Sequence, residues 1–355
     1  SQHSRFTPRA HAPPVAFSAI LWSIMGKSAA SRRTAVATTI SGAGFGSTPA
    51  PLKASDFGVA LPGWGERHPG TPGERQRVLL ETLHRLEEAS AEARYHRLAQ
   101  QNLARWAEAA AAPSPPPPGG ACAVRVLPGD WGEVTLALTK EYGVTFAALN
   151  MANAYAPGGG YTQGMIAQEE NMFRRTDCHF SLRRGVDFDP ATDLYLPDHT
   201  HELNAKDGRV HLDVERPRVC IRGPEDRSRE DLGYQWLADE DVFPFYELRA
   251  AAVDLRQWMS RFSQEETERR CAAQLDTLIA AEVRHVVLSA FGCGAFCNPA
   301  QKVAAAYRKA LTPRAEHFDV VAFGIFHAGY GPNNFAPFAS EFENWPGPPS
   351  SARRK

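Results

Sequence analysis

Apolar residues recur with a helical period in some stretches of this chain and form short continuous runs in others. Between residues 74 and 112 they return mostly every three to five positions among Glu, Arg and Gln, without an internal glycine or proline, which predicts one or two amphipathic helices. Thr71, Pro72 and Glu74 add a cap, a first-turn proline and a capping-box acid at the start of this stretch. Because an apolar helix face needs a partner surface, we expect this region to pack against the rest of the chain.

From residue 121 onward, short apolar runs that predict strands alternate with helical patterns. The predicted strands are 122–127, 144–150, 219–222, 286–290 and 320–326, and the predicted helices are 168–182, 265–282 and 300–311. Residues 131–142 fit either element, and residues 185–217 are polar and loop-rich. Such alternation is typical of a parallel or mixed sheet flanked by helices, so we expect an α/β domain.

Prolines and glycines divide the chain further. The block at residues 113–120 consists of five prolines, one serine and two glycines, which predicts a linker. We therefore expect five parts: a disordered or targeting segment (1–60), a helical accessory region (61–112), the linker (113–120), the α/β domain (121–340) and a disordered tail (341–355).

The first 55 residues contain no acidic residue and are rich in Ser, Ala, Thr and Arg. Their apolar run, residues 15–25, is shorter than the roughly 20 residues that a membrane-spanning helix needs. Two interpretations stay open, a low-complexity disordered extension and an organelle-targeting segment.

The charge balance argues against one class of partner. The 39 basic and 40 acidic residues give a net charge of −1, but six basic residues precede the first acid, Asp56, so the rest has 33 basic residues, 40 acidic residues and a charge of −7. An acidic body lacks the broad positive field of a nonspecific nucleic-acid binder. We expect neither nucleic-acid readout nor a membrane partner.

One strand, loop and helix unit carries candidate chemistry. After the strand that ends near Asn150, Pro157 precedes three consecutive glycines, Gly158, Gly159 and Gly160, and Gln168, Glu169 and Glu170 follow at the start of a predicted helix. Glycines let backbone approach a ligand closely. The pattern therefore predicts a backbone loop beside two carboxylates, although a mobile loop and two acids that merely favour the helix dipole would look the same.

A second glycine-rich turn joins the predicted strand 286–290 to the helix 300–311. It reads Gly292, Cys293, Gly294, Ala295, Phe296. Unpaired N–H groups and the positive end of a helix dipole converge at such a turn, which makes it a candidate anion site. A tight packing turn is the alternative.

Together these two units resemble a known family. Three glycines followed after seven residues by Gln-Glu-Glu are similar to the signature of the poly(ADP-ribose) glycohydrolase family of macrodomains, and the preceding Pro157 with Asn153 upstream resembles its microbial type. The Gly-Cys-Gly-Ala-Phe turn resembles the family's second ligand loop, and the resemblance covers about residues 121–339 in matching order. It implies a macrodomain fold, a mixed β-sheet flanked by helices, with an N-terminal helical extension.

The resemblance also implies an activity and a set of roles. The activity would be cleavage of the O-glycosidic ribose–ribose bond of poly(ADP-ribose), releasing ADP-ribose without metal or cofactor. Burial beside Met165, Met172 and Phe173 would raise the pKa of the catalytic acid. The implied roles are proton transfer by Glu170, ribose binding by Glu169 and Asn153, diphosphate contacts by the backbone of Gly158, Gly159, Gly160, Gly292, Gly294 and Ala295, and adenosine packing by Phe296, with Gln168 and Cys293 completing the substrate-binding set.

The sequence gives little support for a zinc site built from its cysteines. The six cysteines contain one close pair, Cys293 and Cys297, without a second pair or a Cys/His cluster that would complete a zinc site, and scattered thiols suit a reducing interior. We expect an intracellular, cytoplasmic or nuclear monomer whose partners are ADP-ribose, poly(ADP-ribose) and ADP-ribosylated proteins. Three alternatives remain: a hydrolase of protein-linked ADP-ribose, for example on arginine, a hydrolase of another nucleotide-linked ADP-ribose compound, and a macrodomain that binds ADP-ribose without cleaving it.

Overall fold

The computed structural model describes residues 72–87, 89–110, 122–256, 258–327 and 331–347. The expected N-terminal segment 1–60 and the expected linker 113–120 lie outside these residues. None of the helices in the described ranges is long and apolar enough to cross a membrane.

Within these ranges, seven strands form one sheet in the order β1-β9-β8-β2-β7-β5, with β6 paired to β7 as well. The four central pairings, from β1 through β9, β8 and β2 to β7, are parallel, whereas β5 and β6 run antiparallel to β7. The strands are β1 (Ala123–Pro128), β2 (Ala147–Met151), β5 (His211–Leu212), β6 (Arg218–Cys220), β7 (Phe243–Ala250), β8 (His285–Leu288) and β9 (Val320–Ile325). A short hairpin, β3 (Phe188–Asp189) and β4 (Leu194–Tyr195), lies outside the sheet.

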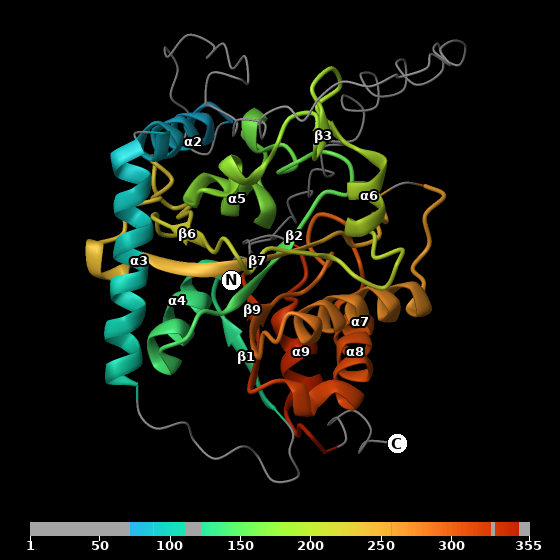
Figure 1. The fold of residues 1–355 in the computed structure, drawn as a ribbon. Coiled ribbons are helices and arrows are strands. Elements are labelled where there is room, and N and C mark those ends of the chain that lie inside the picture. Colours follow the sequence, from blue (N-terminus) through green and yellow to red (C-terminus); the bar gives the residue numbers. More distant parts are fainter. Residues whose placement is uncertain (1–71, 88, 111–121, 257, 328–330, 348–355) are drawn as a thin grey trace, which may run out of the picture. The chain divides into compact units, whose positions relative to one another are not determined.

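Helices cover both faces of the sheet (Figure 1). Along β9 the side chains alternate, because Val321 and Phe323 join the core with α7, α8 and α9, while Val320 and Ala322 pack with α4. The helices are α2 (Pro72–Glu87), α3 (Ala89–Ala109), α4 (Trp131–Tyr142), α5 (Gln168–Arg175), α6 (Pro197–Leu203), α7 (Gln264–Ala280), α8 (Ala300–Leu311) and α9 (Phe335–Phe342). The expected α/β fold with a mixed sheet flanked by helices is confirmed.

The structure decides one ambiguous stretch and shortens one predicted helix. The ambiguous stretch 131–142 is the helix α4, because Asp130 and Glu133 form a complete capping box at its start. The helix expected over 168–182 ends at Arg175, and the chain then turns alongside β6. There the amide of Ile221 donates to the carbonyl of Arg175 at 2.9 Å, and Thr176 bridges Cys220. These pairings replace the bonds that a longer helix would have made.

Two regions hold more regular structure than the sequence indicates. The polar stretch 185–217 contains β3, β4, α6 and β5. The disordered tail expected from residue 341 begins inside α9, whose Phe342 is buried in the core, and Trp345 Nε1 donates to the carbonyl of Cys122 at 2.9 Å. The described residues from 341 onward are therefore ordered by packing against β1 and α8, although their polar and proline-rich sequence predicts disorder.

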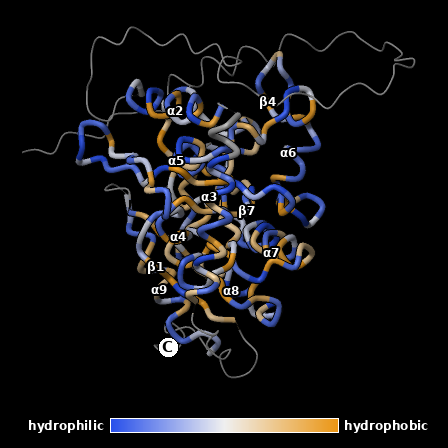
Figure 2. The backbone as a smooth tube through the Cα atoms, turned by 60° about the vertical axis from the view of Figure 1, so that its left-hand side comes forward, coloured by the Kyte–Doolittle hydropathy of each residue, from blue (hydrophilic) through white to orange (hydrophobic). Residues whose placement is uncertain are grey.

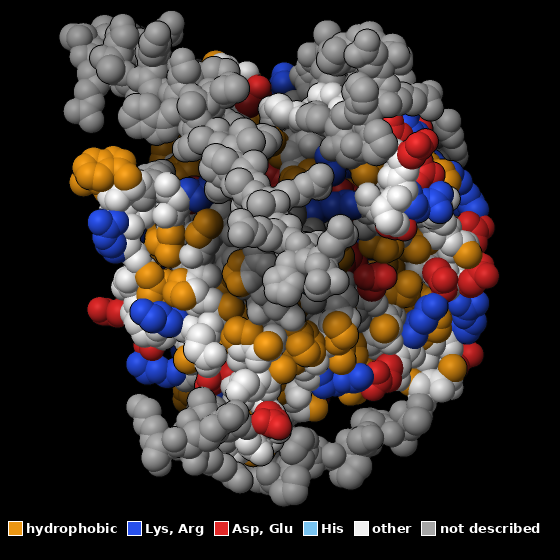
Figure 3. Space-filling model, turned by 180° about the vertical axis from the view of Figure 1, so that it is seen from behind, with side chains coloured by type: hydrophobic (Ala, Val, Ile, Leu, Met, Phe, Trp, Pro, Cys, Tyr) orange, Lys and Arg blue, Asp and Glu red, His pale blue; other side chains and the backbone are white. Residues whose placement is uncertain are grey.

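The distribution of side chains follows from this layering. Hydrophobic positions gather along the inner strands and the helix stretches that face them (Figure 2). On the face shown in Figure 3, Lys and Arg side chains lie interspersed with Asp and Glu in the part that is coloured by type.

Candidate active site

The candidate site begins where α5 meets the end of β2. Gln168, the first residue of α5, accepts a hydrogen bond from the amide of Met151 at its Oε1 and donates from its Nε2 to the carbonyl of Leu149, both at 2.8 Å. Both polar atoms of Gln168 are thus occupied by the backbone of β2. The side chain thus fixes the start of α5. Its amide group can still donate a second N–H and accept a second hydrogen bond, so the ligand contact expected of it stays a prediction.

Glu169 is buried next to the loop that follows β2. Its Oε2 accepts from the amide of Asn153 at 2.7 Å, and 3% of the residue is exposed. Its Oε1 is buried and has no hydrogen-bond partner among the described residues. Burial raises the pKa of Glu169 well above its usual range, and the neighbouring charge of Glu170 adds to the increase. Glu169 therefore holds a proton to higher pH than an exposed glutamate does.

Glu170 is held by backbone at both carboxylate oxygens. Oε1 accepts from the amide of Gly160 and Oε2 from the amide of Ala167, each at 3.0 Å. The second bond satisfies a donor at the start of α5, as a capping acid does, whereas the first reaches across to the glycine triplet. Met172 and Phe173 are fully buried beside this turn, but Met165, expected to help bury the acid, is 44% exposed.

The glycine triplet is shaped by these carboxylates. Gly158 and Gly159 have positive φ angles of 69° and 62°, and a Cβ on Gly159 would lie 2.5 Å from Oε1 of Glu170. Any larger residue would collide with the acid and strain the backbone. The structure therefore brings Gly159, Glu169 and Glu170 into direct contact.

The second loop, residues 292–298, follows β8 and precedes α8. Asn298 ties it down through hydrogen bonds from its Nδ2 to the carbonyls of Val253 (2.8 Å) and Gly292 (3.1 Å). Gly292, at φ 71°, packs so closely on Ala252 that a Cβ would lie 2.5 Å from it. Gly294 and Ala295 are exposed, and within the described chain the amides of residues 294, 295 and 296 have no acceptor. These three N–H groups are available to an anion.

Cys293 is buried inside this loop, and its part in substrate binding stays a prediction. The residue is 5% exposed, and its amide already donates to the carbonyl of Ala290 at 2.9 Å. Burial raises the pKa of its thiol to about 12, so the thiol is protonated at neutral pH and is not an activated nucleophile. No group of three His, Cys, Asp or Glu side chains within the described residues is placed to hold a metal ion.

No sequence motif points to Arg256 as a site residue. Its guanidinium lies over the ring of Phe296, 4.9 Å from the centroid, and pairs with Asp254 at 2.7 Å. The hydrogen bond to Asp254 raises the pKa of Arg256, and the charge of Glu170 contributes to the increase. Arg256 therefore lies within electrostatic reach of Glu170. The segment 253–256 belongs to no motif, so only the fold places it here.

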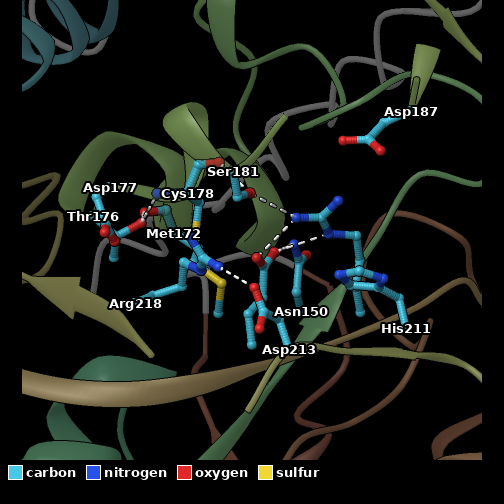
Figure 4. A network of polar contacts seen from close by, with 12 residues as sticks. Asn150, Met172, Thr176, Asp177, Cys178, Ser181, Asp187, His211, Asp213 and Arg218 are labelled. Carbon is cyan, nitrogen blue, oxygen red and sulfur yellow. Dashed lines mark hydrogen bonds and ion pairs between the residues drawn. The ribbon is translucent and has the colours of Figure 1, made fainter. Parts of the chain in front are cut away.

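A buried polar network around Arg249 and Glu247 lies within electrostatic reach of Glu169. Arg249 pairs with Glu247 at 2.8 Å and donates to Tyr195 Oη (3.1 Å) and Ser181 Oγ (3.2 Å), while Asn150 donates to Glu247 at 2.7 Å. Figure 4 shows Ser181 and Asn150 turned toward the centre of this network. Burial opposes the charge of Glu247, but the ion pair with Arg249 outweighs it and lowers the pKa of Glu247 to about 2. The network therefore fixes charges next to Glu169.

Comparisons with known proteins agree with this fold. Two solved structures of poly(ADP-ribose) glycohydrolase from Thermomonospora curvata share the fold. The first has a TM-score of 0.53 and 23% identity and covers 76% of this chain and 99% of its own. The second, bound to the inhibitor ADP-HPD, has a TM-score of 0.52 and 22% identity with the same coverage of both chains. Among curated proteins, none is significantly similar to this sequence.

A family model adds sequence evidence over α2 to α6. Residues 74–204 match the model of the microbial-type PARG catalytic domain, where PARG denotes poly(ADP-ribose) glycohydrolase. This range contains the glycine triplet, Gln168 and both glutamates, and it also includes the helices α2 and α3. The match confirms the family resemblance that the motifs indicate: over residues 74–204 the chain is similar to the microbial-type PARG catalytic domain.

Proposed function

We propose that this protein is an ADP-ribose glycohydrolase that cleaves the ribose–ribose O-glycosidic bond of poly(ADP-ribose) and releases ADP-ribose. The family match supports the class, a glycosidase hydrolase. The observation that carries the proposal is the position of Glu170, whose Oε1 accepts from the amide of Gly160 inside the glycine triplet. A ligand lying against that triplet would meet the carboxylate directly.

One carboxylic acid performs both chemical steps in this proposal. Cleavage passes through an oxocarbenium-like transition state, so the leaving oxygen needs a proton and a water molecule must be oriented at the anomeric carbon. Ordinary glycosidases use two acids about 5–9.5 Å apart across the bond, whereas Glu169 and Glu170 are adjacent on one helical turn. Glu170 protonates the leaving ribose oxygen and then takes a proton from the attacking water.

Glu169 and Asn153 orient the sugar. Asn153 Oδ1 accepts hydrogen bonds from the amides of Tyr155 (2.8 Å) and Ala156 (3.0 Å). The side-chain NH₂ of Asn153 is then oriented to donate to a ribose hydroxyl. Glu169, protonated over a wider pH range because of its burial, can donate to or accept from the neighbouring hydroxyl. The diphosphate would bind to the amides of Gly294, Ala295 and Phe296, which supply directed N–H groups in a part of the chain that has more acidic than basic residues.

The direct test is incubation of the protein with poly(ADP-ribose) and, separately, with mono-ADP-ribosylated protein, followed by detection of free ADP-ribose. We expect release from the polymer. Release only from the modified protein would identify a mono-ADP-ribosyl hydrolase, and binding of ADP-ribose without any release would identify a non-catalytic macrodomain.

We expect turnover to survive excess chelator. In this proposal, backbone amides stabilise the diphosphate and a carboxylic acid transfers the proton, so no step requires a metal ion. The measurement is the rate on poly(ADP-ribose) before and after treatment with EDTA, with an added-magnesium arm as control. A loss of rate that magnesium restores would assign the protein to a metal-dependent class of ADP-ribosyl hydrolase.

The burial of Glu169 leads to a separate prediction, about how the stability of the protein depends on pH. Because the pKa of Glu169 is higher in the folded than in the unfolded chain, its contribution to stability is fully present below the unfolded pKa and is lost as pH rises through the folded pKa. A glutamine at this position does not titrate. We therefore expect the Tm of Glu169→Gln, relative to wild type, to increase between pH 5 and pH 8. A difference in Tm that stays constant across this range would contradict the raised pKa.

A further inference from the structure

Residues 160–167, here called the connecting loop, join the glycine triplet to α5, and Glu170 binds this loop at both ends. Inside the loop, the amide of Met165 donates to the carbonyl of Gly160 at 3.0 Å. The side chains of Met165 and Ile166 are exposed, so little apolar packing holds the loop from its outer side. Contacts on its inner side therefore fix the two amides that bind Glu170.

Two side chains hold the connecting loop by its backbone carbonyls. Gln76 on α2 donates from its Nε2 to the carbonyl of Thr162 at 2.9 Å. Arg174 on α5 donates from its Nη2 to the carbonyl of Met165 at 2.5 Å. The helix α2 packs against α5 (Figure 1), and both helices contact the turn Tyr161–Gln163 inside the loop. The loop is thus fixed at two points between its ends.

Arg174 occupies its position at a cost to stability. The residue is fully buried, and its Nη1 has no hydrogen-bond partner among the described residues. Its Nε donates to Tyr234 Oη at 3.2 Å, and that hydroxyl donates to Glu225 Oε2 at 2.8 Å. The connection from Arg174 to this carboxylate therefore runs through a tyrosine. A buried guanidinium with an unmet donor costs free energy, which favours a role for Arg174 other than stability.

A strained turn presents Tyr234 to Arg174. Leu232, Gly233 and Tyr234 have positive φ angles of 57°, 69° and 48°. This conformation is unfavourable for leucine and tyrosine, and such strain persists where the surrounding structure enforces it. Leu232 and Tyr234 are fully buried and pack with Val78 of α2. The helix α2 therefore supports the turn that places the tyrosine.

Arg75 of α2 completes the chain of contacts. Its Nη2 binds Glu225 Oε1 at 2.7 Å, and both side chains are almost fully buried. Burial opposes the charge of Glu225, but the hydrogen bonds from Arg75 and Tyr234 outweigh it and lower the pKa of Glu225. Burial raises the pKa of Tyr234, so its hydroxyl stays protonated and donates to Glu225 while it accepts from Arg174. Polar contacts thus run from α2 to the connecting loop.

We infer that Gln76, Arg174 and Tyr234 are positioning residues for Glu170. They hold the connecting loop where its end amides reach the carboxylate. The inference rests on the proposed glycohydrolase function, because that function assigns the proton transfer to Glu170. A misplacement of about 1 Å can lower a rate by about 100-fold, so loss of one of several contacts should cost about tenfold.

Tyr234→Phe removes one hydroxyl and keeps the ring. We expect kcat on poly(ADP-ribose) to fall about tenfold while the Kd of ADP-ribose stays within about threefold, because the acid moves and no ligand contact is removed. Tyr307→Phe is the matched control. Tyr307 Oη donates to Gln274 at 2.8 Å between α8 and α7, and the residue is as buried as Tyr234. Its variant should lower Tm similarly and leave kcat unchanged.

Gln76→Glu tests the second contact with a side chain of the same shape. The carboxylate cannot donate to the carbonyl of Thr162 and repels it, so kcat should again fall about tenfold. Gln76→Lys restores a donor and should recover most of the rate. Gln101→Glu makes the same change at an exposed position of α3 and should match wild type. Rates that fall in proportion to Tm in every variant, Tyr307→Phe included, would show that these residues only stabilise the fold.

Hydrogen exchange separates this inference from the proposed function. Mass spectrometry follows the amides of the connecting loop and needs no turnover. Residues 160–167 should exchange faster in Tyr234→Phe and Gln76→Glu than in wild type and in the two controls, whereas a peptide from β9 should not change. Faster exchange in a protein that does not cleave poly(ADP-ribose) would refute the hydrolase and retain the positioning of Glu170. Unchanged exchange, or faster exchange with full kcat, would overturn the inference.

Discussion

Glu170→Gln is expected to remove essentially all turnover on poly(ADP-ribose) while ADP-ribose affinity changes by no more than several-fold. The oxygen of the substituted side-chain amide can still accept a hydrogen bond from Gly160, as the carboxylate does at 3.0 Å, so the glycine loop keeps its position. The amide cannot, however, donate a proton to the leaving oxygen or take one from water. The measurements are kcat on the polymer and the Kd of ADP-ribose by calorimetry.

Two further variants sharpen this result. Glu141→Gln changes the same chemical group on an exposed helix position paired with Arg125, and its rate should match wild type. Glu169→Gln should impair both turnover and affinity, because Glu169 orients the ribose. If Glu170→Gln keeps more than about a tenth of the wild-type rate, a loss below about 1.4 kcal/mol, Glu170 is not the general acid.

The second large effect is expected from truncation. A chain that starts near Leu61 should fold and turn over like the full chain, whereas a chain that starts near Gly119 should lose both stability and activity. The shorter chain lacks α2 and α3, which bury six large apolar side chains: Val78, Leu79, Leu83, Leu86, Tyr95 and Trp106. At about 1.5–3 kcal/mol each, their burial is comparable with the net stability of a domain, about 5–15 kcal/mol.

Specific contacts connect α2 to the candidate site. Leu79 and Leu83 share a core cluster with Tyr161 and Phe173, next to the glycine triplet. Thr82 Oγ1 donates to the carbonyl of Arg174 on α5 at 2.8 Å. Loss of α2 would therefore expose the back of the helix that carries both glutamates.

Thermal melts and rates for the two truncated chains decide this prediction. Deletion of residues 1–60 is expected to be neutral because that stretch has no sustained hydrophobic period and almost no acids. If the chain starting near Gly119 melts and turns over like the longer one, α2 and α3 form an independent module, and their contacts with α5 and β7 are dispensable.

Much of the fold could be predicted from local pattern, because strong periods and caps leave few alternatives. The helix expected over 300–311 is α8 with the same bounds, and the strand expected over 320–326 is β9, one residue shorter. The prediction failed where long-range pairing competes with local preference. Thr176 forms a bridge with Cys220 and does not continue the helix, and Phe342 in α9 is buried in the core. The residues that Thr176 and Phe342 contact are far from them in the sequence, so local patterns do not reveal these contacts.

For the candidate site, the order of residues along the chain specifies which chemical groups are available: three glycines that permit positive φ, two adjacent glutamates, and a second glycine turn before a helix. How these groups are used depends on the folded chain. Folding turned both polar atoms of Gln168 to β2, buried Cys293, raised the pKa of Glu169 by burial, and brought Arg256 to Phe296. Composition and spacing fix which groups a segment can offer, whereas burial, charge and hydrogen-bond partners arise from contacts between segments far apart in the chain.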